Sequence, residues 1–314
     1  MIRQGISLFA SSLRYLSLLV YSRQRSVNFA PLTSLTALET LELERKAIAQ
    51  EGFRETLQQM RSVKKLHTDF LGYLDENTRE SIATLPGLRT LYCRGHFMHD
   101  EEEDSIPLAR RISQLTDLTI SVNGKLISEL GCLTRLVLLK LRVFCDVDCL
   151  LDSALACMPR LQGLGVKFAG NYLEHAANKD VKSLSLSSNA LSNMKKLQLV
   201  FLDRVDVDKL FFQQLASKTK LKGLGFCPFK PKTYSQSFLS QINTLKSIQL
   251  LKLRIADDCD VSKLLSPQCL PKIKELTLHD AAAGQVEALR RKFACLGQVL
   301  INHDESPWCS RLCI

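Results

Sequence analysis

The sequence predicts an α/β solenoid, in which short parallel strands stack side by side and the chain returns between them along the outside. Three observations predict this fold class. Leucine-like residues recur as L-x-x-L-x-x-L-x-L, the recurrence keeps an interval of about 25 residues, and several stretches between copies have the apolar spacing of helices. The composition, with 46% hydrophobic and 24% charged residues, is that of a folded chain.

The strands come from the last L-x-L of each copy. In the clearest copy, Leu35 and Leu38 precede the strand leucines Leu41 and Leu43. Alternate side chains of a strand point to opposite faces, so both strand leucines enter the core. The final strand positions are Leu18, Leu43, Thr68, Cys93, Ile120, Leu141, Val166, Leu202, Phe226, Leu253 and Leu278. About 11 repeats therefore stack into a horseshoe with a parallel sheet on its concave side.

The returns on the convex side are expected to mix helices with irregular segments. Three returns have apolar residues at helical spacing, namely Phe53, Leu57 and Met60; Phe238 or Leu239 with Ile242 and Leu245; and Val286, Leu289 and Phe293. The short step that ends at Leu141 leaves little room for a helix, so extended or 3₁₀ returns are expected there. The long step that ends at Leu202 contains Leu184 and Leu186 and holds either an extra short repeat or an insertion. We expect one domain over residues 1–314, with a C-terminal tail over 300–314.

The repeats resemble those of the leucine-rich-repeat superfamily over about residues 6–300. Segments such as residues 32–41 are similar to the irregular repeats of two intracellular families, plant-type NLR immune receptors and F-box substrate receptors. The Asn that usually follows the strand occurs cleanly once, at Asn189. The resemblance implies a non-enzymatic module, either the ligand-recognition arm of an NLR-like defence receptor or the substrate-recognition arm of a ubiquitin ligase.

Both families place a partner domain before the repeats, a nucleotide-binding switch or an F-box. Here the first strand is already under way at Leu13. We therefore expect a fragment, a truncated relative or a free-standing repeat protein.

Residues between and after the strand leucines are expected to face a protein partner on the concave side. Acidic residues occur early in this series and basic residues later, which would orient a partner of complementary charge. The alternative is a solvated sheet face without a partner. The predicted protein-binding residues are Glu42, Glu44, Asp69, Tyr92, Arg94, Lys140, Arg142, Lys167, Phe201, Lys252 and Arg254.

Two repeats share the core L-x-G-L-G, at residues 161–165 and 221–225. Glycine in a strand often marks a close approach of another backbone, so a partner could lie flat there. The alternative is a relic of repeat duplication. Neither copy has the third glycine of a dinucleotide-binding fingerprint.

No motif predicts catalysis, a cofactor or a metal site. Cys93, His96 and His99 are the nearest approach to a zinc cluster, but Cys93 falls on an inward position of the repeat, where a small apolar residue serves the core. The acidic run over residues 100–104 is expected to be a solvated loop, or else a partner contact. No named catalytic constellation occurs, so enzyme activity is only a remote alternative.

The overall composition favours an intracellular protein. The cysteine count of 11 is odd and scattered, no Asn begins a glycosylation sequon, and no signal peptide or apolar run of membrane-spanning length is present. We expect the cytoplasm, with the nucleus possible, and no membrane contact. The net charge of +10 admits nucleic acid as a partner, but the aromatic content is low at 7% and no binding motif occurs, so nucleic acid is not the expected partner. The oligomeric state is left open.

Overall fold

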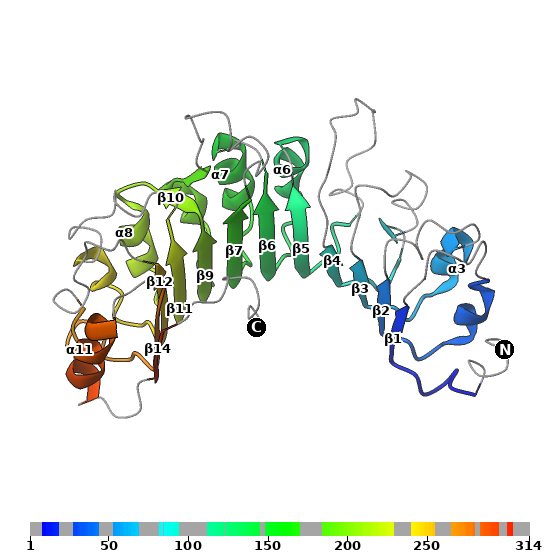
Figure 1. The fold of residues 1–314 in the computed structure, drawn as a ribbon. Coiled ribbons are helices and arrows are strands. Elements are labelled where there is room, and N and C mark those ends of the chain that lie inside the picture. Colours follow the sequence, from blue (N-terminus) through cyan, green and yellow to red (C-terminus); the bar gives the residue numbers. More distant parts are fainter. Residues whose placement is uncertain are drawn as a thin grey trace, which may run out of the picture. The chain divides into compact units, whose positions relative to one another are not determined.

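The structure of the chain is a computed structural model. It describes residues 8–18, 28–43, 53–68, 82–83, 85–93, 112–122, 124–144, 148–169, 184–228, 240–254, 265–279, 283–294 and 300–303. The chain forms two compact units, Met1–Leu141 (unit 1) and Arg142–Ile314 (unit 2). Each unit is a short solenoid of parallel strands (Figure 1).

Unit 1 has a parallel sheet whose neighbouring strands are one repeat apart. Its register pairs Leu16 with Leu41, Leu41 with Leu66 and Leu66 with Leu91, so each strand leucine stacks on its counterpart. The strands are β1 (Tyr15–Leu18), β2 (Thr40–Leu43), β3 (Lys65–Thr68), β4 (Thr90–Cys93) and β5 (Asp117–Val122). The returns include the 3₁₀ helix η1 (Ala30–Ser34) and the α-helices α3 (Phe53–Gln59) and α6 (Gly124–Leu130).

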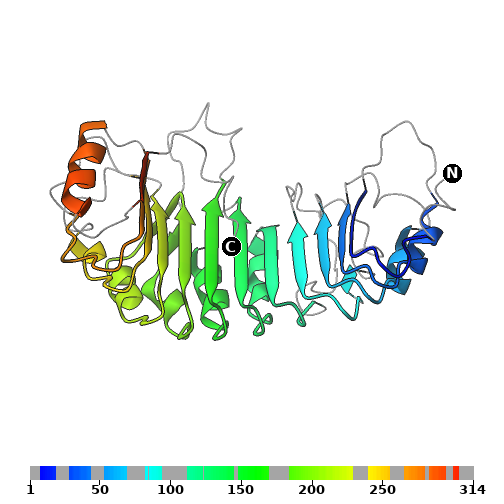
Figure 2. The ribbon, with the colours of Figure 1, turned by 90° about the horizontal axis from the view of Figure 1, so that it is seen from below.

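Unit 2 repeats the same arrangement. Its parallel sheet has the order β7 (Gly163–Phe168), β9 (Leu199–Asp203), β11 (Gly223–Cys227), β12 (Leu250–Arg254), β13 (Glu275–His279) and β14 (Leu300–His303). The helices are α7 (Asp148–Ala156), η2 (Ser188–Leu191), α8 (Phe211–Ala216) and α11 (Ala283–Phe293), and in the view from below they lie along one side of the sheet (Figure 2). Strand β6 (Leu138–Val143) contains the boundary between the units.

The core consists of the leucine-like residues that the repeat pattern identifies. Leu41, Leu91, Leu139 and Leu251 are all 0% exposed. Each repeat thus contributes its strand leucines to an apolar layer that only the neighbouring repeats cover, as expected for a solenoid. The predicted fold class, a leucine-rich-repeat solenoid with parallel strands and mixed returns, is confirmed.

A hydrogen-bond ladder links the turns that lead into the strands. In unit 2 the carbonyl of Gln162 accepts hydrogen bonds from the N–H groups of Gln198 (2.8 Å) and Leu199 (2.9 Å). The carbonyl of Gln198 accepts from Lys222 (2.7 Å) and Gly223 (3.0 Å) in the same way. Because each turn satisfies the backbone of the next, the turns are held in a regular row.

The long step before Leu202 holds an insertion and not an extra strand of the main sheet. Strand β7 pairs directly with β9, with Gly163 opposite Leu199. Within the insertion, β8 (Leu184–Leu186) forms a separate two-stranded sheet with β10 (Val205–Val207). Arg204, with a φ of 58°, provides the left-handed bend between β9 and β10.

Three predictions about the returns and the tail can be compared with the structure. The helices predicted at Phe53 and Val286 are confirmed as α3 and α11. The short step before Leu141 was predicted to hold little helix, yet α6 has seven residues there, as many as α3. Residues 300–303, expected in the tail, form β14. In the third predicted helix, residues 240–242 are helical, and Phe238 and Leu239 lie outside the described residues.

Candidate binding face

In unit 1 the register aligns polar and aromatic side chains on the face opposite the leucines. Ser17, Glu42, His67 and Tyr92 occupy one row across β1–β4. The ring centroids of His67 and Tyr92 are 5.4 Å apart. Two of the predicted binding residues, Glu42 and Tyr92, are therefore neighbours of the same ring, His67, on adjacent strands.

Glu42 is held by a hydrogen bond from the preceding strand. The hydroxyl of Tyr15 donates to the Glu42 carboxylate. This hydrogen bond, followed by burial and the negative charge of Glu42, raises the pKa of Tyr15 above its ordinary value. Glu44, Asp69 and Arg94 lie outside the described residues, so Glu42 alone represents the predicted acidic segment.

Strand β6 carries Lys140 and Arg142, which were both predicted to bind. Lys140 is half-buried and Arg142 is exposed. The guanidinium carbon of Arg142 lies 5.2 Å from the centroid of the Phe144 ring, a distance typical of a cation–π contact. The ring supports the Arg142 side chain while its charge stays accessible.

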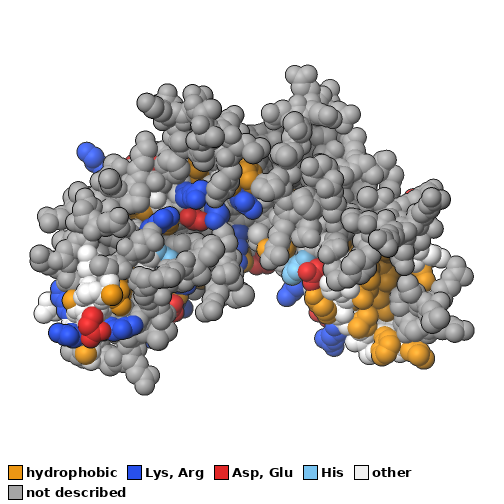
Figure 3. Space-filling view, viewed as in Figure 1, with side chains coloured by type: hydrophobic (Ala, Val, Ile, Leu, Met, Phe, Trp, Pro, Cys, Tyr) orange, Lys and Arg blue, Asp and Glu red, His pale blue; other side chains and the backbone are white. Residues whose placement is uncertain are grey.

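In unit 2 the predicted lysines are paired with carboxylates that the sequence analysis did not select. Lys167 Nζ lies 2.7 Å from an Asp203 carboxylate oxygen, and Lys252 Nζ lies 4.0 Å from a Glu275 oxygen. Lys167 and Asp203 are direct partners in the register of β7 and β9. Figure 3 shows basic side chains gathered around acidic ones near the carboxyl ends of the unit 2 strands.

Arg254 and Cys227 extend this charged row along β12 and β11. Arg254 is exposed, and one of its guanidinium N–H groups points at the Cys227 sulfur at 3.9 Å. Burial, followed by the negative charge of Asp203, raises the pKa of the Cys227 thiol to about 11. A thiol that remains protonated at neutral pH is a poor nucleophile, so Cys227 belongs to the packing of the face.

Phe201 was predicted to be an exposed binding residue, but it is only 8% exposed. In the register it lies between Gly165 and Gly225, and Leu199 lies between Gly163 and Gly223. A Cβ added to Gly223 would be 2.5 Å from a Leu199 methyl carbon. At Gly223, therefore, the absence of a side chain accommodates a neighbouring side chain and does not require a partner to lie flat.

The possible zinc cluster is placed only in part. Cys93 is 3% exposed, as expected for its inward position, whereas His96, His99 and the acidic run 100–104 lie outside the described residues. Among the residues that are described, no group of three or more His, Cys, Asp and Glu could hold a metal. In the same part of the chain no helix is both long enough and apolar enough to cross a membrane.

Stacked parallel strands, a constant register and buried strand leucines define a leucine-rich-repeat solenoid fold. The fold is similar to an internalin (InlF) of Listeria monocytogenes, with 13% identity over 96% of this chain and 89% of the internalin and a TM-score of 0.51. It is also similar to a chain of the mouse RP105/MD-1 complex (17% identity, 96% of this chain and 49% of that chain, TM-score 0.52).

A third similar structure is the TLR13–ssRNA13 complex (17% identity, 88% of this chain and 37% of that chain, TM-score 0.50). At these identities the likeness establishes the fold alone. No protein-family model matches the chain, and no curated protein matches its sequence.

Proposed function

We propose that this chain is a non-enzymatic module that binds another protein through the concave side of its sheet. The observation that carries the proposal is the charged row of unit 2, in which Lys167 on β7 pairs with Asp203 on β9, and Arg254 on β12 is separated from Asp203 only by Cys227 on β11. Ion pairs and the strand register pre-organise these side chains, which lowers the entropic cost of binding.

Within this class, we favour the ligand-recognition arm of an NLR-like defence receptor that acts in the cytoplasm. The support is the likeness of the repeat sequences to that family, for example over residues 32–41. The substrate-recognition arm of an F-box ubiquitin ligase is the second candidate, and the nucleus is an additional location. A nucleotide-binding domain or an F-box encoded upstream would distinguish the two candidates.

The binding face can be tested by affinity capture. The wild-type chain and a double variant, Arg142→Glu with Arg254→Glu, are immobilised and the captured proteins are identified by mass spectrometry. Because both arginines are exposed, the free energy of unfolding of the double variant should stay within about 0.5 kcal/mol of the wild-type value. The partner captured by the wild type should be lost from the variant.

The control is Arg135→Glu, which changes an exposed arginine in a turn of unit 1. This variant should capture the same partner as the wild type. If the double variant retains the partner fully, the concave face of unit 2 is not the binding surface.

A further inference from the structure

The turns that lead into the unit 2 strands carry a dense row of cations. In each repeat the turn contains the residues around the last core leucine before the strand. Arg160, for example, directly precedes Leu161, and Lys196 directly precedes Leu197. We call this row the turn ridge. Its eight basic residues are all exposed and are Arg160, Lys195, Lys196, Lys220, Lys222, Lys246, Lys272 and Lys274.

In the described part of the chain, no acidic side chain is paired with a cation of the ridge. The turn segments 157–162, 192–198, 217–222, 244–249 and 268–274 contain no Asp or Glu. None of the eight cations has an ion-pair partner among the described residues. In the free protein, solvent and counter-ions balance these exposed charges, and a bound polyanion would release the counter-ions.

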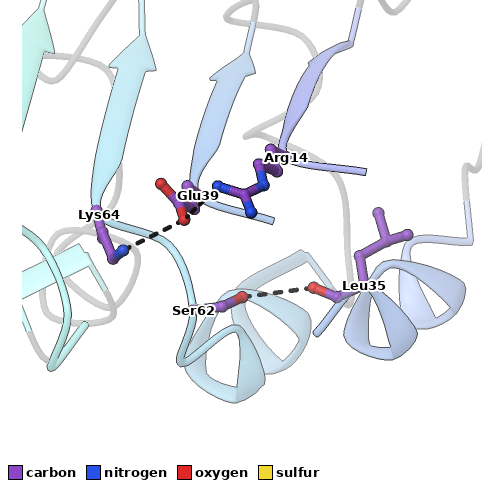
Figure 4. Close-up of polar contacts among 5 residues, drawn as sticks. All are labelled: Arg14, Leu35, Glu39, Ser62 and Lys64. Carbon is purple, nitrogen blue, oxygen red and sulfur yellow. Dashed lines mark hydrogen bonds and ion pairs between the residues drawn. The ribbon is translucent and has the colours of Figure 1, made fainter. Parts of the chain in front are cut away.

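The equivalent turns of unit 1 show how such a charge can be neutralised. There Glu39 lies between two cations, 3.6 Å from Arg14 and 3.3 Å from Lys64 (Figure 4). Glu39 directly follows the core residue Leu38. The unit 2 residues that directly follow the equivalent core leucine or isoleucine are Gln162, Gln198, Lys222, Gln249 and Lys274. Gln162 and Gln198 are joined by a neutral hydrogen bond of 2.9 Å between their side chains.

The ridge is also rigid and regularly spaced. The turn carbonyls of Gln162, Gln198, Lys222 and Gln249 each accept two N–H groups of the next repeat, at 2.7–3.0 Å. Neighbouring strands of a sheet are about 4.8 Å apart, so five successive turns span roughly 19 Å. A rigid linear row of cations fits a linear polyanion of high charge density.

We infer that the turn ridge binds the phosphate backbone of a nucleic-acid duplex without reading its sequence. Seven of the eight cations are lysines, which act as point charges and lack the bidentate geometry that arginine uses for base edges. The turn segments contain no aromatic residue, so bases of a single strand would have no side chain to stack on.

Two other polyanions fit the ridge less well. An anionic membrane surface is usually held by apolar side chains as well as cations, and none of the large exposed hydrophobic residues of the described chain lies in these turns. An acidic peptide offers fewer charges per unit length than a duplex, which has one phosphate per about 1.7 Å of axis. This inference is independent of the proposed protein partner on the concave side.

The test measures binding of a fluorescent 24-base-pair DNA duplex, and of an RNA duplex of the same length, by anisotropy at several salt concentrations. Contact with three or four phosphates predicts a slope of log K against log salt of about −3 for the DNA duplex. The ridge variant carries Lys→Gln at positions 196, 220, 246 and 272. It should bind at least about tenfold more weakly at low salt, with a slope shallower by at least about 1.

A control variant removes the same net charge elsewhere in unit 2, away from the turn ridge, with Lys→Gln at positions 209 and 292 and Arg→Gln at positions 290 and 291. It should bind either duplex within about threefold of the wild type and show an unchanged salt slope, and both variants should melt like the wild type. Ridge-dependent binding of the DNA duplex, the RNA duplex or both supports the inference.

Three results would overturn it. The first is that the wild type binds neither duplex at low salt. The second is that the ridge variant and the control variant lose the same affinity. The third is tighter binding, at the same salt, to polyglutamate or to vesicles of phosphatidylserine than to either duplex. Protein binding is tested separately, by affinity capture with the Arg142 and Arg254 variant. A negative result for duplex binding therefore leaves the protein-binding proposal standing, and the reverse also holds.

Discussion

At the scale of single residues, Gly223 shows how the concave face of unit 2 is packed. The neighbouring Leu199 fills the space that a side chain at position 223 would need. Gly223→Ala should therefore destabilise the chain by only about 0.5–1 kcal/mol, because the atom met is the terminal methyl of the half-buried Leu199 side chain, which must change its rotamer. The free energy of unfolding in urea measures this effect.

Gly284 in α11 is the matched control, since an added Cβ there meets no atom within 4 Å. Gly284→Ala should leave stability unchanged or raise it by up to about 1 kcal/mol, because alanine favours the helix. Equal effects of the two substitutions would show that the packing at Gly223 is not as described.

Lys218 is a second residue whose role is set by burial. It is 7% exposed, and its ammonium group donates hydrogen bonds to the carbonyl oxygens of Leu191 (2.7 Å) and Ser192 (3.4 Å). Burial, followed by the charge of Lys195, lowers the pKa of Lys218 from its ordinary value of 10.5. The lysine thus satisfies the backbone at the end of η2.

Lys218→Met should cost about 1–3 kcal/mol, because it leaves a buried carbonyl without its donor. The lowered pKa means that the unfolded chain keeps this proton to higher pH than the folded chain does. The stability difference between wild type and variant should therefore widen as the pH rises through the lowered pKa of Lys218 toward the ordinary value of 10.5. Exposed Lys196→Met is the control and should change stability by less than about 0.5 kcal/mol. A difference that narrows with rising pH would contradict this assignment.

At the scale of elements, the strands could be predicted because their leucines recur at a fixed phase. Every predicted final position, from Leu18 to Leu278, lies within an observed strand. The phase also identifies inward and outward residues, so the burial of Leu41 and Leu91 follows from the sequence alone.

Elements that depend on contacts between distant segments could not be predicted in this way. The small sheet of β8 and β10 depends on residues 184–186 meeting residues 205–207, which no local pattern encodes. Helix α6 lies in a step that was judged too short for a helix from length alone. Strand β14 lacks the leucine pattern of the other repeats and is identified by its pairing with β13.

The repeat phase predicted which residues lie on the candidate face, but it did not predict which of them form ion pairs. Lys167 and Lys252 were selected because they follow the phase, whereas their partners Asp203 and Glu275 were not selected. Asp203 occupies the same repeat position as Lys167, so the opposite charges of these two neighbouring repeats were the signal for this pair. The low exposure of Phe201 required knowledge of the glycines on both neighbouring strands.

At the scale of the whole molecule, each repeat buries its apolar layer only against its neighbours. Within unit 1 the inward leucines of β2 are 0–2% exposed, whereas Leu16 and Leu18 of the terminal strand β1 are half-buried. Leu8 and Phe9 nearby are 79% and 55% exposed. This gradient is expected of a terminal repeat, which has a described neighbour on one side only.

The charge of the whole chain is also distributed unevenly. The formal net charge is +10, and the turn ridge of unit 2 alone contributes eight cations that have no ion-pair partner among the described residues. The charged row on the strands of the same unit instead contains both positive and negative side chains, in the ion pairs of Lys167 with Asp203 and of Lys252 with Glu275. The two surfaces are therefore suited to different partners, the ridge to a polyanion and the charged row to a protein of mixed charge.

The central claim is that the repeat phase decides which residues form the core and which form the binding face. Adjacent residues of β6 test it most directly, because Leu139 is 0% exposed and Lys140 is on the opposite face. Leu139→Asp and Lys140→Asp are compared by circular dichroism during urea unfolding. Leu139→Asp should unfold the chain or cost more than about 4 kcal/mol, since it buries a charge without a partner, whereas Lys140→Asp should cost less than about 1 kcal/mol. A Leu139→Asp variant that loses less than about 1 kcal/mol, or equal losses in both variants, would contradict the account.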